Sequence, residues 1–343
     1  MEEERSVDKN GHSSDLRASR VSEKPMSTAI KNLIANARAA QGVRLHTPVG
    51  LDEPTHAIPT SQIRNIFLDL TQPVPNIAAF FDSKGKLRRI PSGRANFSQG
   101  TVDPLSVARG SSRLAAAGAH LILRPAALPP QNGGQPGIVV MQREVSGISI
   151  VQPLKLSAVA DEADSPSVTE LPVKSASVDW TDETRAPAYG IQLEIPRNDY
   201  RDRLHDGTLD EVLTAAILAG AGRIADQALM DALAAASLPE FSLAAAASSG
   251  LAFHELRAIV GTAGAGAAVG QDGVLRASGI SAELTDTGAQ TFIGAFDHAA
   301  VILDRDIRVI AEKTGKAGAL AITVYAAAAP LLPDKAKFWK VAA

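Results

Sequence analysis

The sequence predicts an α+β fold with one long helix, a strand-rich C-terminal part and a hairpin that projects from the body. Residues 208–236 carry apolar side chains at helical spacing. Residues 277–312 hold short apolar runs separated by turn residues, which is typical of strands. Residues 146–180 have apolar, strand-like ends around an acidic middle, which has no stripe that could be buried against a core.

The composition excludes several classes of protein. With 343 residues the chain is long enough for two domains and a buried core. A net charge of -3 gives no global basic field that would attract nucleic acid. The absence of cysteine excludes disulfides and thiolate chemistry, and it suits a reducing cytosol. No uninterrupted run of about 18 apolar residues occurs, so no membrane-spanning segment is expected.

The N-terminal third is expected to be an arm. Residues 1–26 are charged, lack an apolar signal-peptide core and predict a tail. A short helix follows over residues 27–42, with Ser27 or Thr28 as its cap and Gly42 at its end. The buried stripe of this helix would be formed by Ile30, Leu33, Ile34 and Ala37.

Residues 84–124 are strongly basic, with Asp103 as the single acid. The cations are Lys84, Lys86, Arg88, Arg89, Arg94, Arg109, Arg113 and Arg124. Such a run indicates either a solvated extended arm or an arm that lies on an acidic partner or on DNA. The segments 120–125 and 137–145 then predict two strands of a hairpin, joined by a loop rich in proline and glycine.

The second half of the chain supplies the regular elements. Alternating apolar residues predict a strand over 188–195, which Pro196 ends. The long helix over 208–236 has Thr208 and Glu211 as a capping box. Its small residues Ala216, Gly220 and Gly222 would let another element approach closely. Beyond it we expect a short helix at 251–261, a glycine-rich loop at 262–273, three strands within 277–312, a final strand and a tail.

The chemistry-bearing residues do not form a catalytic pattern. The segment 264–270, GAGAAVG, lacks the Lys-Ser/Thr end of a nucleotide loop and follows a predicted helix rather than a strand. Asp297 and His298 are adjacent, so on a strand their side chains would point to opposite faces. A hydrolase using these two residues and Asp304 would need a pocket that gathers them. A turn at residues 304–306 explains the charges there without chemistry. We therefore predict no catalytic, cofactor-binding or metal-binding residue.

The alternative is assembly, because arms and loops that cannot bury themselves usually bury against neighbouring chains. The closing half supports this through its order of parts. It has a Gly-Ile step at 279–280, a Gly-Ala-Phe strand start at 294–296 and an Asp-Arg pair at 304–305. Pro333 and the aromatic pair 338–339 follow the last strand. Over about residues 146–343 the chain resembles the major capsid proteins of tailed phages with the HK97-type fold.

This resemblance implies a division of the chain and a function. The parts would be a disordered tail (1–26), an N-terminal arm and extension (27–145), an extended loop (146–187), a peripheral domain with a long spine helix (188–239 and 299–343) and an axial domain (240–298). Such proteins self-assemble into pentamers and hexamers that form an icosahedral shell around double-stranded phage DNA. The alternative with the same fold is an encapsulin-like compartment shell enclosing cargo enzymes.

The resemblance also implies partners and a location. The partners would be further copies of the chain, portal and scaffold proteins, and packaged DNA through non-specific contacts, with no membrane and no cofactor. The location would be the virion capsid, assembled in the host bacterial cytoplasm. From the opposite charge bias of two segments we further predict an inter-subunit contact. It would pair Arg88, Arg89, Arg94 and Arg113 of one copy with Asp161, Glu162 and Asp164 of a neighbour.

Overall fold

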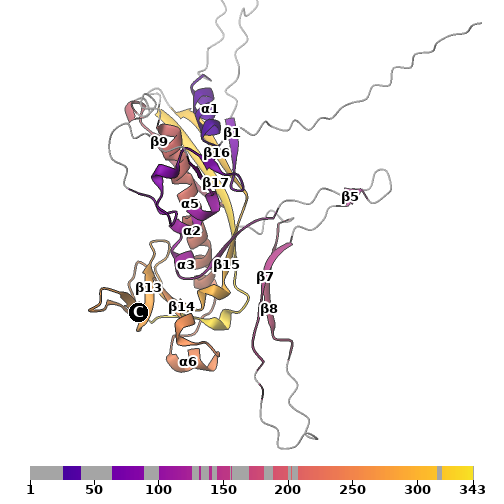
Figure 1. Cartoon of the computed structure of the whole chain (residues 1–343), viewed down its shortest axis with the longest axis vertical. Coiled ribbons are helices and arrows are strands. Elements are labelled where there is room, and N and C mark those ends of the chain that lie inside the picture. Colours follow the sequence, from indigo (N-terminus) through magenta and orange to yellow (C-terminus); the bar gives the residue numbers. More distant parts are fainter. Residues whose placement is uncertain are drawn as a thin grey trace, which may run out of the picture.

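The computed structural model confirms the α+β class (Figure 1). One six-stranded sheet packs against the long helix, a second six-stranded sheet lies at one end of the body, and a two-stranded hairpin stands beside it. The structure describes residues 26–39, 64–88, 100–125, 131–132, 139–140, 145–154, 156, 170–180, 188–199, 202, 208–314 and 319–342. Most of the predicted tail therefore lies outside the described residues.

The main sheet is built around one long strand, β17 (Ala319–Leu331). This strand pairs antiparallel with β16 (Asp306–Thr314), β9 (Ala188–Ile195) and β15 (Ala300–Leu303). The outer strands β1 (Arg64–Asp69) and β4 (His120–Leu123) pair with β16 and β15. The strand predicted at 188–195 and the turn at residues 304–306 are confirmed.

Alternation along the strands gives the main sheet two apolar faces. On β15, Val301 and Leu303 belong to the large core that contains the long helix, whereas Ala300 and Ile302 belong to a separate cluster with Trp180. The same alternation holds on β17, where Ala328 faces the first cluster and Ala329 the second. The long helix and the hairpin therefore lie on opposite faces of the sheet.

The predicted long helix is α5 (Leu209–Ala235), about 40 Å at 1.5 Å per residue. Thr208 stands at its N-cap but in a near-helical conformation, and its side chain makes no capping hydrogen bond, so the capping box is wrong. By length and composition α5 could cross a membrane, but 67% of its apolar window is buried inside the protein. Its apolar side chains thus belong to the core of this chain.

The N-terminal helix α1 (Met26–Ala39) packs on α5 and on β1. Its predicted stripe is confirmed, since Ile30, Leu33, Ile34 and Ala37 are buried. The helix begins at Met26, so Ser27 and Thr28 lie within it and not at its cap. The predicted terminator Gly42 lies outside the described residues.

The expectation of an extended arm over 84–124 is wrong for residues 101–123. They form β3 (Thr101–Val102), α2 (Pro104–Ser111), α3 (Arg113–Ala116) and β4. The helices pack on α5, and Val107, Ala108 and Leu114 are fully buried. Close contact is possible because a side chain at Gly222 would overlap the carbonyl of Ala108. Of the three small residues predicted to admit another element, Gly222 does so, while Gly220 has nothing near it and Ala216 is exposed.

The hairpin predicted between 120–125 and 137–145 is also wrong. β4 instead pairs in parallel with β15, with His120 opposite Ala300. β6 (Val139–Val140) pairs with β5 (Gln131–Asn132) in a small ribbon of its own. Short strand signals fix the element type, but here a partner far along the chain decides the pairing. A further small ribbon joins β2 (Val74–Pro75) to β3.

The second sheet has the order β11-β12-β13-β10-β14-β18. The strands are β10 (Arg257–Val260), β11 (Ala267–Val269), β12 (Leu275–Ala277), β13 (Ile280–Leu284), β14 (Phe292–Gly294) and β18 (Phe338–Lys340). Helix α6 (Leu243–Ser248) packs on it.

Four expectations for the second sheet and the segments around it are wrong. The short helix expected over residues 251–261 is a 3-10 turn, η2 (Phe253–Glu255), followed by β10. The expected C-terminal tail is β18, whose Trp339 is buried in the core of this sheet. The segment 277–312 contains β13, β14, β15 and β16, one strand more than predicted. The residues expected as a glycine-rich loop supply β11 and the turns on either side of it, where Gly264 and Gly266 before the strand and Gly273 after it have positive φ.

Candidate assembly surfaces

The projecting hairpin is confirmed as β7 (Val145–Val151) paired antiparallel with β8 (Val173–Asp179). Its base is anchored on the main sheet. Trp180 is buried there against Ile302 and Leu331, and Ile148 and Val178 pack beside it. The guanidinium of Arg124 lies 5.0 Å from the centre of the Trp180 ring, and Gln152 Nε2 donates to Asp334 Oδ2 at 2.6 Å. The base of the hairpin is therefore part of the folded body.

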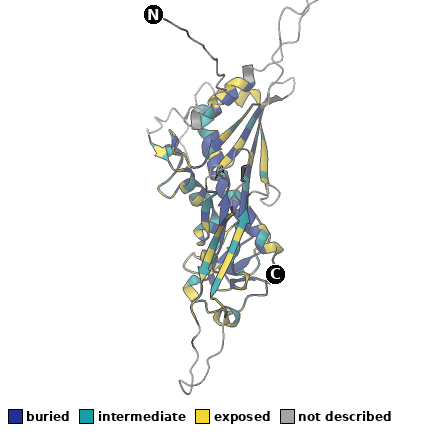
Figure 2. Ribbon diagram, turned by 90° about the vertical axis from the view of Figure 1, so that its right-hand side faces the viewer, coloured by how far each residue is buried: buried dark blue, intermediate teal, exposed yellow. Residues whose placement is uncertain are grey.

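The apolar side chains described at the far end of the hairpin, on either side of Gln152, are uncovered. Val151, Leu154, Leu156 and Leu171 are 74%, 60%, 91% and 80% exposed. Figure 2 views the molecule from this side and shows exposed residues along the hairpin strands. Two strands alone are marginally stable in water, and large apolar side chains gain stability only when they are covered. The far end of the hairpin thus has the exposed apolar side chains expected of one side of a protein–protein interface.

The same side of the main sheet carries a second exposed apolar surface. Phe67 and Tyr325 flank Arg308 in one row across three paired strands, and they are 60% and 44% exposed. Tyr325 lies on the face that the hairpin base covers, because it alternates with Val324, which faces α5. The ring of Tyr325 lies over Gly190, where a side chain would overlap it. We call Phe67, Arg308 and Tyr325 the open sheet face.

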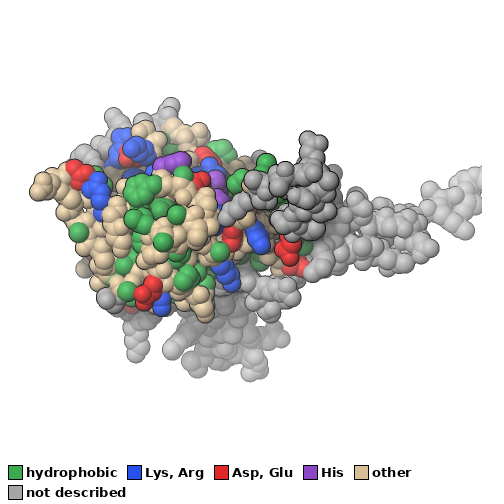
Figure 3. Space-filling view, turned by 90° about the horizontal axis from the view of Figure 1, so that it is seen from below, with side chains coloured by type: hydrophobic (Ala, Val, Ile, Leu, Met, Phe, Trp, Pro, Cys, Tyr) green, Lys and Arg blue, Asp and Glu red, His purple; other side chains and the backbone are tan. Residues whose placement is uncertain are grey.

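Exposed apolar side chains also occur at the end of the molecule formed by α6 and the second sheet, which Figure 3 views directly. They are Leu243, Phe253, Val269, Val274 and Leu284. These side chains come from α6, η2, β11, β13 and the turn after β11 rather than from one continuous element. This end differs in that respect from the hairpin, where four apolar residues gather at and just beyond the ends of one pair of strands.

The predicted charge contact between subunits stays a prediction. Arg88 is exposed and Arg113 is half-buried at the start of α3. The other residues of the predicted contact lie outside the described residues, namely Arg89, Arg94, Asp161, Glu162 and Asp164.

The residues considered for catalysis are not brought together. Asp297 and His298 lie in the 3-10 turn η3 (Phe296–His298), not on a strand as expected. Asp304 lies beyond the far end of β15, about 13 Å away at the rise of a strand, and its carboxylate is 3.6 Å from Arg124. None of the three lines the cavity of about 940 Å³ beside α2 and α3. Nor does the described part of the chain contain three or more His, Asp or Glu side chains placed to hold a metal ion.

Sequence reasoning missed one buried polar centre. Asp226 of α5 is fully buried and accepts hydrogen bonds from Ser112 and from two backbone N–H groups of α3. Burial raises the pKa of Asp226 above its ordinary value, while these hydrogen bonds and Arg223 oppose that shift. The available signal was an acid at position 226 that shares a helix face with Gly222 and Leu229.

No protein-family model matches the chain, and no curated protein matches it. Solved structures do resemble it. The capsid of the native GTA particle is 12% identical, with 74% of this chain and 96% of that chain covered and a TM-score of 0.40. The satellite phage P4 procapsid is 9% identical, with 69% and 96% covered and a TM-score of 0.40. The virus-like particle from Pyrococcus furiosus is 12% identical, with 70% and 96% covered and a TM-score of 0.37. At these scores the function proposed below rests on the chain's own geometry.

Proposed function

We propose that this chain is a structural major capsid protein. Its copies assemble into pentamers and hexamers that close into an icosahedral shell around double-stranded phage DNA, with the shell as part of the virion and assembly in the host cytoplasm. The observation that carries this proposal is the far end of the hairpin, where Val151, Leu154, Leu156 and Leu171 stand uncovered beside a body that buries the base of the same hairpin.

A second copy is the occupant that fits this hairpin best. The hairpin and the open sheet face lie on the same side of the molecule, and each exposes apolar side chains that the other could cover. Full burial of a leucine contributes about 1.5–3 kcal/mol, and a ring of copies repeats each contact at every subunit. Rings form when one surface of a copy meets a different surface of the next copy.

The division into parts enters the proposal with two changes to its boundaries. We assign α5 and the main sheet to the peripheral domain, the second sheet and α6 to the axial domain, and the β7–β8 hairpin to the extended loop. Because β18 pairs with β14, the C-terminal residues 338–340 belong with the axial domain. Residues 64–123 belong with the peripheral domain, since their strands and helices pack on its sheet and on α5.

The test is electron microscopy of the purified protein together with light scattering after size exclusion. We expect closed shells or rings of five and six subunits. Leu156→Asp/Leu171→Asp should prevent them and leave a folded subunit with the circular dichroism of the unchanged chain. Leu243→Asp on α6 is the matched control for an exposed leucine and should still assemble. A monomer from the unchanged chain at every salt and protein concentration would overturn the proposal.

The contents of the shell separate the two kinds of particle. Nuclease-protected DNA within particles from infected or induced cells supports the phage role. Particles that instead enclose a single co-purifying enzyme would identify a compartment shell of the encapsulin kind. Both outcomes keep the assembly proposal, and the contents of the particle decide between them.

A further inference from the structure

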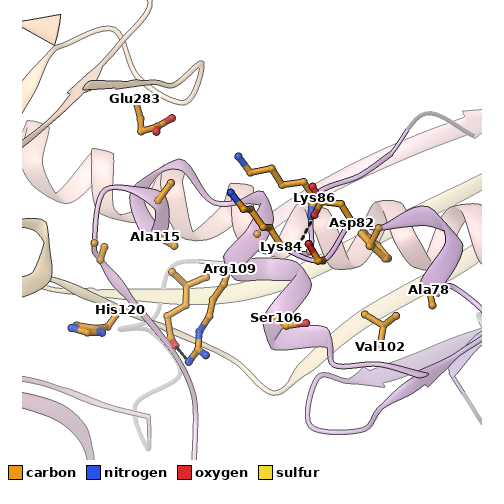
Figure 4. Close-up of a pocket in the computed structure, with 18 residues that line it drawn as sticks. Ala78, Asp82, Lys84, Lys86, Val102, Ser106, Arg109, Ala115, His120 and Glu283 are labelled. Atoms are coloured by element: carbon orange, nitrogen blue, oxygen red, sulfur yellow. Dashed lines mark hydrogen bonds between the residues drawn. The ribbon is translucent and has the colours of Figure 1, made fainter. Parts of the chain in front are cut away.

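A basic cleft lies on the side of the molecule opposite the hairpin. It has a volume of about 940 Å³ and lies between the turn of residues 82–86, the helices α2 and α3, and the start of β4 (Figure 4). Its basic side chains come from three segments, with Lys84 and Lys86 in the turn, Arg109 on α2 and His120 on β4. All four side chains are exposed.

Two acids of the cleft balance part of the charge of these side chains. They are Asp82 and Glu283. Asp82 Oδ1 accepts the backbone N–H groups of Lys84 and Lys86 at 2.8 and 2.9 Å, so this carboxylate holds the turn together. Glu283 lies across the cleft on β13 (Figure 4), and among the described residues no ion pair joins an acid to Lys84 or Lys86.

The turn that carries the lysines is fixed against α2. A side chain at Gly85 would lie 2.5 Å from the carbonyl oxygen of Ser106, and one at Gly110 would overlap the carbonyl of Lys84. Gly85 also has a φ of +76°, a conformation that favours glycine. The two backbones are therefore in direct contact, and the lysine side chains extend from a rigid support into the cleft.

The position of the cleft separates it from the proposed contact between copies. α2 packs on α5, which covers one face of the main sheet, while the hairpin base covers the other. The cleft therefore lies away from both the hairpin and the open sheet face. A contact made through these two surfaces does not use the residues that line the cleft.

We propose that this cleft binds the phosphate backbone of the enclosed double-stranded DNA, an inference that rests on the proposed shell function. Basic side chains distributed along a cleft suit a polymer of regularly spaced phosphates. Lysine binds phosphate as a point charge, and neutralising each phosphate releases counterions, so binding weakens as salt increases. None of the cleft residues forms a base-reading element, so no sequence preference is expected.

The test measures binding of a fluorescent 30-base-pair duplex by anisotropy between 50 and 300 mM salt. All proteins carry Leu156→Asp/Leu171→Asp, so that the cleft is accessible whether or not the unchanged chain forms shells. Lys84→Gln/Lys86→Gln should weaken binding at every sequence and lower the slope of log affinity against log salt by about 2, one for each lost lysine contact. The matched control, Lys335→Gln/Lys340→Gln, removes two exposed lysines near the second sheet and should keep the slope.

Two results would overturn the inference. The first is failure of the duplex test: either the unchanged cleft does not bind the duplex at 50 mM salt, or the two lysine variants give equal slopes. In the second, the duplex does not bind, but a labelled peptide of residues 157–170 does, and its binding depends on Lys84 and Lys86. This peptide contains Asp161, Glu162 and Asp164. That result would assign the cleft to the acidic loop of a neighbouring copy. If Lys84→Gln/Lys86→Gln in the otherwise unchanged chain still gives shells of normal form, the shell function does not depend on this inference.

Discussion

The carboxylate of Asp226 accepts a hydrogen bond from Ser112 Oγ at 2.6 Å, at a depth where Asp226 is 0% exposed. The backbone N–H groups of Arg113 and Leu114 donate to the same carboxylate at 2.9 and 3.1 Å. One acid of the spine helix α5 thus ties down the start of α3. Buried donors that lose their acceptor are costly, so this contact joins the two helices more firmly than apolar packing alone.

Replacement of Asp226 should therefore be among the more damaging single changes. Asp226→Ala leaves three buried donors without an acceptor and should lower the free energy of unfolding by about 3 kcal/mol or more. Ser112→Ala removes one donor to Asp226 and also the N-cap acceptor of the Ala115 N–H, and it should cost about 1–2 kcal/mol. Urea unfolding followed by the fluorescence of Trp180 and Trp339 measures both. An equal cost for the two changes would contradict the role given to Asp226.

Two glycines of the same helix should respond with opposite signs. Gly222→Ala places a methyl group against the carbonyl of Ala108 and should lower the melting temperature, because α2 must move away. Gly220→Ala meets nothing within 4 Å and should raise the stability by about 1 kcal/mol through helix propensity. Thermal unfolding of the two variants is the measurement, and a shift of the same sign in both would be inconsistent with the packing described.

Glu211, in the first turn of α5, should make stability depend on pH. Burial first, and then the neighbouring Asp210, raise its pKa to about 7, with Lys31 of α1 acting in the opposite direction. Between pH 4.5 and 7 the folded chain keeps a proton that the unfolded chain releases. The stabilising contribution of Glu211 is therefore complete below pH 4.5 and is lost as the pH rises through 7.

Glu211→Gln isolates this effect, since the amide does not titrate. The free energy of unfolding of the unchanged chain minus that of the variant should fall between pH 4.5 and 7 and level off above. Urea titrations at pH 5, 6, 7 and 8 supply the difference. A difference that grows with pH would mean that the Glu211 carboxylate is stabilised in the fold, contrary to its burial.

Trp180 should control the attachment of the hairpin. Trp180→Ala removes the largest side chain of the cluster beneath the hairpin base and should cost about 3 kcal/mol. Trypsin should then cleave after the exposed Lys174 of β8 faster than in the unchanged chain. Val145→Ala, a change at an exposed position of the same hairpin, serves as the control and should leave the cleavage rate as it was.

The elements predicted well from sequence are those whose signal is local. The apolar spacing of α5, the alternation of β9 and the polar middle of the hairpin each lie within one continuous segment. β18 was not predicted, and β4 was predicted as a strand with the wrong partner, because Trp339 and His120 pair with residues far along the chain. The basic run was visible in the sequence, but the close contact at Gly85 and Gly110 that folds part of it into a cleft was not.

The candidate surfaces, too, could be predicted from the sequence only in part. A protruding hairpin could be expected from the acidic middle of residues 146–180, and its strands are where the pattern put them. The uncovered leucines became informative only when Ile148 and Val178 proved to be packed at the base. Exposure is a property of the whole fold, so the sequence pattern alone could not distinguish the covered apolar residues from the uncovered ones.

The central strand β17 gives the molecule a mechanical axis. It pairs with β16, β9 and β15 along its 13 residues, and the chain runs from its end past Asp334, which holds Gln152 of the hairpin, into β18 of the second sheet. Tension applied at the hairpin would load these hydrogen bonds along the strand, so that many must yield together. Close-packed interiors transmit strain. A wall built from such subunits would carry outward pressure through the backbone of one strand in each copy.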